Sequence, residues 1–539
     1  MAPPGPGAPQ PAPAAKGGKG PLIALIAAAV LLVIALAVSF IPFPHSSDGG
    51  PTAAFRAQQE LDKVVFKFGQ TAGAKFSGTL KYTYTTSTNP TEDSIEFKNL
   101  VVSSANNSEG TIKLDTQEAQ YRQIGNNVYA NGPKEFWTKL IPNAPTSLDL
   151  DSVASKWADT DGTGLLWLGS FLSPRKLAGR LAIGDSAAST SLGQELPAPN
   201  NGLPDARFWP TSDPKVTMTG NTITVGSMTT TFDPESKEVT HIKGSSTTAD
   251  GIKYTIDTDV APMTDNDREK LFANERSFAP ELLAVPAPGI GVRDPMMSAV
   301  SNAGSCTSAL CQFAWDLQGK LRSDTYRTGY INYGMNVSFT ANGNAVASPC
   351  SKVVRVDFGS TTRANCDAVN LGNLPNGTSI RANVSNSKYL PFNTKTSDNL
   401  SNIIDKNEAA AKQQITLVRT GTKRPGDATK YNYQITDMPS VYAVKQGDYE
   451  FDGFGPAGSF LITLSTGYDQ HVNGGVFDPN WAGTKTLLEQ AKQQVAAAGN
   501  IHIVWFTAEE NTATAAKALL ASAGITDQKV DVYYSKLES

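Results

Sequence analysis

The chain has 539 residues, and its 46 Lys and Arg against 50 Asp and Glu give a formal net charge of −4 at pH 7. This balance excludes a polybasic nucleic-acid binder, and four cysteines in so long a chain exclude a small disulfide scaffold. At roughly 150 residues per domain the length predicts two to four domains. The 46 Gly and 33 Pro favour β-structure with turns and linkers.

The N-terminal residues 1–20 are mostly Pro, Ala and Gly without apolar periodicity, so we expect a disordered tail. The following stretch, Leu22 to Phe40, contains neither a charge nor a proline. At 1.5 Å per residue it spans about 28 Å, which approaches the roughly 30 Å thickness of a bilayer's hydrocarbon core. The sequence therefore predicts one transmembrane helix over residues 21–43.

Positive charge near this apolar stretch predicts the orientation of the chain. Lys16 and Lys19 precede the stretch, and the first charge after it is Asp48. This asymmetry places residues 1–20 in the cytoplasm and the bulk of the chain outside the cell membrane, as a single-pass protein. A cleaved signal peptide is the alternative, because Ala37-Val38-Ser39 imitates a small-x-small cleavage site.

Strand-like runs separated by turn residues dominate residues 54–262, with a helical opening and a helical middle. They predict an exported β-rich domain, a curved antiparallel sheet with helices. Residues 106–140, NNSEGTIKLDTQEAQYRQIGNNVYANGPKEFWTKL, resemble the LppX, LprA and LprG group of actinobacterial envelope lipoproteins. That resemblance implies an acyl-chain cavity and binding or transport of a lipid or lipoglycan. The candidate cavity residues are apolar: Val65, Phe68, Leu165, Trp167 and Phe171.

Residues 263–305 are predicted to be a linker, in which prolines limit helix formation. A cysteine-bearing region follows over residues 306–425. It holds all the cysteines of the chain, namely Cys306, Cys311, Cys350 and Cys366. An even number in an exported segment predicts two disulfides, with three possible connectivities. We expect sequential pairing. A metal site is the weaker alternative, because no C-x2-C pair occurs.

In residues 426–539, strand-like runs alternate with helical ones. Helices are expected over 484–498 and 509–523, and strands over 501–506 and 530–534. This alternation predicts an α/β layer with parallel strand pairing.

Three blocks in this region, YNYQITDMP, YEFDGFGPAGSFLITLSTGYDQ and LLEQAKQQVAAAGNIHIVWFTAEENTATAAKALLASAGI, resemble a restriction-endonuclease-fold toxin domain of bacterial polymorphic toxins. The resemblance places Asp452 at the metal-ligating Asp of that family. Ile462 stands where a second carboxylate is expected and Leu464 where a Lys is expected, and neither side chain binds a metal. The resemblance therefore implies a degraded nuclease without catalytic residues or cofactor. The alternative is an active site rebuilt from Asp452, Glu450 and Asp469 around a divalent cation such as Mg²⁺.

These observations together predict a multidomain α+β protein of the cell envelope. Its expected parts are a transmembrane helix, an LppX/LprG-like β-rich domain, a disulfide-bearing β-rich region and a restriction-endonuclease-like α/β domain. We expect non-catalytic recognition of an envelope protein or ligand rather than of nucleic acid. An active metal-dependent nuclease toxin and a lipid carrier acting through residues 54–262 are the two alternatives.

Overall fold

The structure is a computed structural model that describes residues 53–86, 89–183, 216–247, 253–293, 310–322, 327–342, 344–370, 372, 374–375, 378–420, 426–455 and 458–537. The chain divides into two compact units, Met1–Arg56 and Ala57–Ser539. The second unit holds almost every described element, and all the contacts below lie within it.

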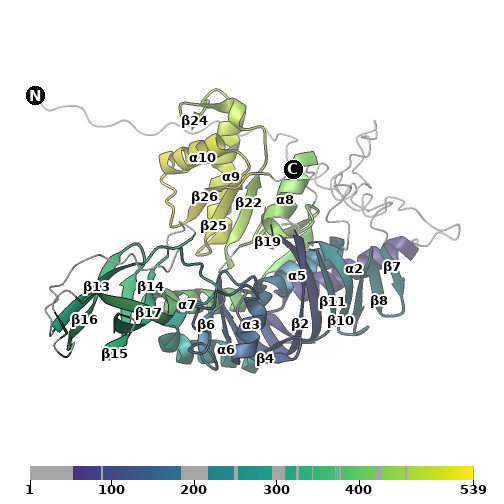
Figure 1. The fold of residues 1–539 in the computed structure, drawn as a ribbon. Helices are drawn as coiled ribbons and strands as arrows, with labels where there is room; N and C mark the ends of the chain where they lie inside the picture. Colours follow the sequence, from purple (N-terminus) through teal and green to yellow (C-terminus); the bar gives the residue numbers. More distant parts are fainter. Residues whose placement is uncertain are drawn as a thin grey trace, which may run out of the picture. The chain divides into compact units, whose positions relative to one another are not determined.

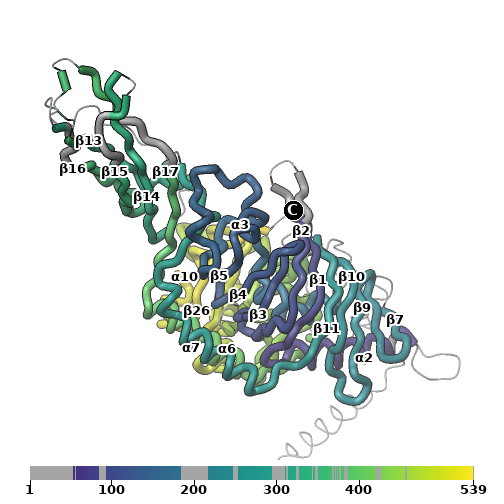
Figure 2. The backbone as a smooth tube through the Cα atoms, turned by 60° about the horizontal axis from the view of Figure 1, so that its bottom comes forward, coloured from purple at the N-terminus to yellow at the C-terminus, as the bar shows by residue number. Residues whose placement is uncertain are grey.

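An antiparallel sheet of eleven strands forms the first half of this unit, in the order β6-β5-β4-β3-β2-β1-β11-β10-β9-β8-β7. Figure 2 shows the strands side by side. Their bounds are β1 Gly73–Thr86, β2 Asn89–Ser103, β3 Ser108–Leu114, β4 Gln117–Ile124, β5 Asn127–Asn131, β6 Trp157–Asp159, β7 Val216–Thr219, β8 Thr222–Val225, β9 Met228–Phe232, β10 Val239–Thr247 and β11 Lys253–Pro262.

The helices of this half are α2 (Ala53–Gln70), α3 (Lys134–Leu140), α4 (Leu168–Phe171) and α5 (Pro174–Ile183). Leu61, Val64 and Phe68 of α2 recur at helical spacing, and each is at most 4% exposed. They belong to the same hydrophobic cluster as the inward-facing side chains of the sheet. Burial of this apolar stripe fixes α2 on the sheet, because each such side chain contributes about 1.5–3 kcal/mol.

Three short elements follow the sheet: helix α6 (Asp265–Phe278), the 3₁₀ helix η4 (Ala279–Leu282) and strand β12 (Ala284–Pro286). They occupy part of the predicted linker, residues 263–305. The Thr264 side chain and the Asp267 side chain cap the start of α6 reciprocally. Leu271 and Phe272 then bury its inner face. A capping box with a buried apolar pair explains why this segment is helical despite the prolines that follow.

A second β-rich region contains a four-stranded sheet of order β12-β17-β14-β15 and a two-stranded sheet β13-β16. The bounds are β13 Leu310–Gln318, β14 Gly329–Ala341, β15 Asn344–Asp357, β16 Thr361–Asn370 and β17 Ile380–Thr394. A disulfide joins Cys350 of β15 to Cys366 of β16, so that expected pair is confirmed. Cys306 and the side chain of Cys311 lie outside the described residues, so their pairing stays a prediction.

The chain ends in mixed α/β structure, reached through helix α7 (Ser397–Lys412). A small sheet β18-β19-β20 precedes a four-stranded sheet β21-β22-β25-β26, in which β22, β25 and β26 run parallel as predicted. Helices α9 and α10 lie beside these parallel strands (Figure 1). The bounds are β18 Thr416–Arg419, α8 Gly426–Thr436, β19 Tyr442–Gln446, β20 Tyr449–Phe451, β21 Gly453–Phe454, β22 Phe460–Leu464, η6 Asp469–His471, β23 Val472–Asn473, β24 Val476–Phe477, α9 Ala482–Ala498, β25 Ile503–Thr507, α10 Glu510–Ser522 and β26 Val530–Tyr534.

The predicted fold class is therefore wrong in one part and needs correction. It included a transmembrane helix, whereas no helix in the described ranges is both long and apolar enough to cross a bilayer. The stretch that gave rise to this prediction, residues 21–43, and the predicted tail, residues 1–20, lie outside those ranges. The described chain is a β-rich α+β unit with one disulfide between β15 and β16. The finer domain limits drawn from the sequence stay predictions.

Candidate functional site

Asp452 lies between β20 and β21 and is only 6% exposed. Its Oδ2 accepts hydrogen bonds from the backbone N–H of Thr463, at 2.7 Å, and from the Thr463 hydroxyl, at 2.8 Å. Its own N–H donates to the carbonyl of Leu461 at 2.9 Å. The carboxylate that the resemblance places at a metal-ligating position is therefore engaged in holding two neighbouring strands together.

Ile462 and Leu464 flank Thr463 on the fully buried strand β22 and are 7% and 5% exposed. Both belong to the main hydrophobic cluster. Because successive side chains of a strand point to opposite faces, Thr463 projects away from its two apolar neighbours. Asp452 binds Thr463, so the structure brings Asp452 to one face of β22 and leaves Ile462 and Leu464 packed on the other.

A chain of polar side chains extends from Asp452 into helix α8. The Asn432 amide donates to the Thr463 hydroxyl at 3.4 Å, and the Thr436 hydroxyl donates to the Asn432 carbonyl at 2.7 Å. Asn432 and Thr436 are 1% and 2% exposed. The helix approaches the hairpin so closely that a Cβ added at Gly453 would lie 2.8 Å from the Cβ of Thr436. This network lies in the interior of the protein and locks α8 onto the hairpin.

The two other carboxylates considered for a rebuilt metal site bind partners of their own. Glu450 is exposed and accepts a hydrogen bond from the Thr420 hydroxyl at 2.6 Å. Asp469 accepts from the N–H and the hydroxyl of Thr512, at 2.8 and 2.7 Å, and thereby caps helix α10. Across the described ranges, no group of three or more His, Cys, Asp and Glu side chains is arranged to hold a metal ion.

Glu509 is a residue that the motif comparison missed. Its carboxylate accepts hydrogen bonds from three consecutive backbone N–H groups, those of Gly467, Tyr468 and Asp469, at 2.9–3.0 Å. The side chain therefore ties the turn after β22 to the start of α10. Two consecutive glutamates before a helical run are a signal for a helix N-terminus, which could have identified it.

Four of the five candidate cavity residues are packed in the hydrophobic core, and the fifth is exposed. Val65, Phe68, Leu165 and Phe171 are at most 4% exposed and lie in the packed core, whereas Trp167 is 47% exposed. A cavity beside Phe68 has a volume of only about 10 Å³. That volume is about the space of one water molecule and far too small for an acyl chain.

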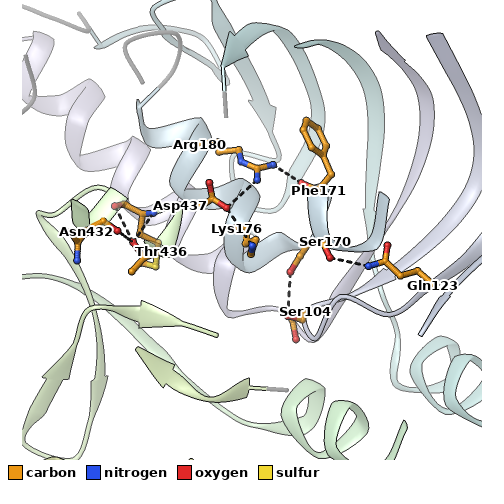
Figure 3. Close-up of polar contacts among 11 residues, drawn as sticks. Ser104, Gln123, Ser170, Phe171, Lys176, Arg180, Asn432, Thr436 and Asp437 are labelled. Atoms are coloured by element: carbon orange, nitrogen blue, oxygen red, sulfur yellow. Dashed lines mark hydrogen bonds and ion pairs between the residues drawn. The ribbon is translucent and has the colours of Figure 1, made fainter. Parts of the chain in front are cut away.

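Helix α5 carries two buried arginines that join the first sheet to the C-terminal elements, and Figure 3 shows one of them, Arg180, beside Asp437 and Phe171. Arg180 donates to the carbonyl of Phe171 at 2.8 Å and to the Asp437 carboxylate at 3.1 Å. Arg175 donates to the carbonyl of Ala410 at 2.9 Å, and its guanidinium lies 4.6 Å from the ring centroid of Phe454. The hairpin of β21 and β22 is thus packed directly against the first half of the unit.

Burial opposes the charged form of Asp437. The neighbouring charges of Arg180 and Lys176 outweigh that burial and hold the pKa of this carboxyl below its ordinary value. Asp437 therefore stays ionised and compensates the buried guanidinium of Arg180. The junction between α5 and the end of α8 is an internal ion pair, and it leaves neither partner's charge isolated.

A groove of about 720 Å³ lies between the first sheet and the second β-rich region. One side contains Trp157 and the loop that leads into β6, and the other contains Asn332, Lys388 and Phe392 of strands β14 and β17. Sequence analysis did not predict this groove, because its walls come from segments that are far apart in the chain and share no local motif.

No protein-family model matches the chain, and no curated protein matches it.

Proposed function

We propose that this protein is a non-catalytic binding protein in which the nuclease-like C-terminal elements serve as a scaffold for recognition. The single observation that carries this proposal is the arrangement around β22. Ile462 and Leu464 are buried in the core, and the Asp452 carboxylate binds Thr463 on the opposite face. Phosphodiester hydrolysis of this type needs carboxylates that share a cation and leave it an open coordination position.

The disulfide between Cys350 and Cys366 supports a location outside the cytoplasm, because structural disulfides persist in oxidising compartments. The formal net charge of −4 gives no attraction toward nucleic acid, so the favoured partner is a protein or a small ligand. A lipid carrier remains an alternative function, but the close packing around Val65 and Phe68 gives it no support.

A nuclease assay on the full chain tests the proposal. Plasmid DNA and single-stranded RNA are incubated with Mg²⁺ or Mn²⁺, using wild-type protein and Asp452→Ala purified side by side. We expect the same background cleavage from both proteins, because Asp452 holds strands together and is not placed to bind a metal. Metal-dependent cleavage that Asp452→Ala abolishes, while a thermal melt shows the variant folded, would overturn the proposal in favour of the nuclease alternative.

A further inference from the structure

The groove of about 720 Å³ has the size of a small-ligand site, which is typically about 300–1,000 Å³. Its floor is the outer face of the sheet β17-β14-β15. The strand register places Asn332 opposite Leu390, and Gly334 opposite both Lys388 and Val353. The alternate residues on β14, such as Ile331 and Met335, are buried on the other face. The fold thus presents one regular row of side chains to the groove.

Gly334 leaves the middle of this floor open. The nearest heavy atom to a Cβ added there would be the Lys388 carbonyl oxygen at 3.7 Å, which is an ordinary van der Waals contact. Gly334 is also absent from the residues with positive φ. A side chain would therefore fit at this position without backbone strain, and it would project into the groove.

Two aromatic side chains face the groove from different walls. Phe392 is half-buried and stacks on Tyr330, with ring centroids 4.9 Å apart and planes 8° apart. Trp157 on the opposite wall is held by the Arg122 guanidinium, 5.0 Å from its ring centroid. Both rings are fixed by neighbours outside the groove. Such pre-positioned aromatic surfaces favour a ligand with flat or puckered rings.

The charges that line the groove balance one another. Lys388 pairs with Asp149 at 3.6 Å and with Asp151, which lies beside the groove, at 2.8 Å. Lys156 and Glu281 add one further charge of each sign to the lining. A strongly anionic or cationic ligand would have to compete with these pairs, so the groove favours a neutral one. The amides of Asn131 and Asn332 supply both donors and acceptors for hydroxyl groups.

A peptide that adds a strand to the sheet fits this groove less well. The edge strand that lines the groove, β12, has only three residues, Ala284–Pro286, and it ends in a proline that has no N–H to donate. Short strands and edge prolines discourage pairing with an additional strand.

We propose that this groove binds a neutral oligosaccharide, with sugar rings against Phe392 and Trp157 and hydroxyl groups on Asn332 and Asn131. The inference goes beyond the proposed binding role, because it assigns a ligand class to a site whose lining does not include Asp452. Neither outcome of the nuclease assay affects this inference. A failure to bind sugars would likewise leave the outcome of the nuclease assay unchanged.

Saturation-transfer NMR and calorimetry on the full chain test this inference. The probes are maltotetraose, cellotetraose, xylotetraose and N-acetylchitotetraose, with tetra-alanine as the peptide probe. We expect at least one tetrasaccharide to bind with a Kd of about 1 mM or tighter. Gly334→Leu should weaken that binding at least about tenfold by filling the floor, and Phe392→Ala should weaken it about tenfold.

Thr217→Leu is the matched control, because it adds an apolar side chain at an exposed strand position of the other sheet. It should leave the Kd unchanged, and a thermal melt should show that all three variants are folded. Three results would each overturn the inference: no tetrasaccharide binds, the binding survives Gly334→Leu in folded protein, or tetra-alanine displaces the sugar from the groove. The last outcome would identify a peptide site.

Discussion

Thr463 determines how the Asp452 carboxylate is used. Its backbone N–H and its hydroxyl both donate to the same carboxylate oxygen, within 2.8 Å. The hydroxyl of Thr463 therefore binds a carboxylate and stabilises the fold at this position. Thr463, the residue between Ile462 and Leu464, is therefore as informative as those two buried residues themselves.

Replacing this hydroxyl by a methyl group should destabilise the protein. Thr463→Val keeps the shape of the side chain but removes one of the donors to the buried Asp452 carboxylate. We expect the free energy of unfolding to fall by about 1–3 kcal/mol, which is typical when a buried polar group loses a partner. Urea denaturation measures the change. Thr416→Val, at an exposed position of β18, is the control and should change little. Equal effects of the two substitutions would contradict this role for Thr463.

Glu275 of helix α6 is fully buried, with the Asn107 amide donating to its carboxylate at 2.6 Å. Burial raises the pKa of this carboxyl well above its ordinary value, although the Asn107 hydrogen bond and the charge of Arg122 oppose the rise. The folded protein therefore holds a proton that the unfolded chain releases at lower pH. As pH rises above the ordinary Glu range, this group lowers stability until its folded pKa is passed.

Glu275→Gln should remove that pH dependence. At pH 7 the variant should be more stable than wild type by on the order of 1 kcal/mol, because the amide needs no proton and cannot ionise. The difference should shrink toward pH 4, where the wild-type carboxyl is protonated in both states. Thermal melts from pH 4 to 7 measure it, with Glu269→Gln on the exposed face of the same helix as the control. A difference that stays constant across this range would refute the linkage.

At the scale of elements, α5 is the connection between the first sheet and the C-terminal α/β layer. Its Gly179 lies so close to the turn after α8 that an added Cβ would be 2.1 Å from the Asp437 carbonyl oxygen. The same helix contributes Arg180 to the ion pair with Asp437. A second connection is the bidentate pair of Asp62 in α2 with Arg419 in β18, at 2.9 and 3.0 Å. These contacts join the first sheet and the C-terminal α/β layer within one compact unit.

Breaking the α5 connection should destabilise the whole unit. Asp437→Asn preserves the side-chain shape and tolerates the positive φ of 55° at this position, but leaves the buried Arg180 without its counter-charge. We expect a loss of about 3–5 kcal/mol, as for other buried pairs that lose one partner. Asp265→Asn, at an 84% exposed side chain paired with Arg268, should cost about 0–1 kcal/mol. Similar losses of stability in both variants would show that the buried ion pair at this junction contributes no more than the exposed pair.

Local sequence patterns predicted the helices and strands in which apolar residues recur at a regular period. Helices α9 and α10 and the parallel strands β25 and β26 follow from apolar periodicity and from the glycines that end the helices. Helix α6 was missed, because the prolines after it outweighed its capping box in the interpretation of that stretch. Asp452 was singled out through the resemblance to the toxin domain. Its partner Thr463 could be found only from the register of β21 and β22.

At the scale of the whole molecule, the disulfide between β15 and β16 stabilises one region more than the others. It closes a loop with a sequence separation of 16 residues, for which the chain-entropy estimate is about 3 kcal/mol. Replacing Cys350 and Cys366 by Ala should therefore accelerate hydrogen exchange in β14, β15 and β16 by far more than in β1 and β2. Mass spectrometry of peptic fragments measures this. Uniform acceleration across both sheets would contradict the regional effect.

The groove could not be predicted from the sequence, because no local signal marks it. Trp157 and Phe392 are separated in the chain by strands β7 to β11 and by most of the second β-rich region, and only the docking of the two sheets brings their segments together. The same holds for the ion pair of Arg180 with Asp437. Sites built within one hairpin or one helix can be inferred from spacing, whereas sites built between layers require the tertiary arrangement.

The pairing of β1 with β11 at the centre of the eleven-stranded sheet also constrains folding during synthesis. Strand β1 ends at Thr86, yet its partner β11 begins only at Lys253. During synthesis, the backbone N–H and C=O groups on one edge of β1 therefore stay unpaired until β11 has been translated. In this interval the edge can pair with a strand of a neighbouring nascent chain. Expression yield should consequently depend on cellular holdases and on growth temperature, even for variants whose finished fold is as stable as the wild type.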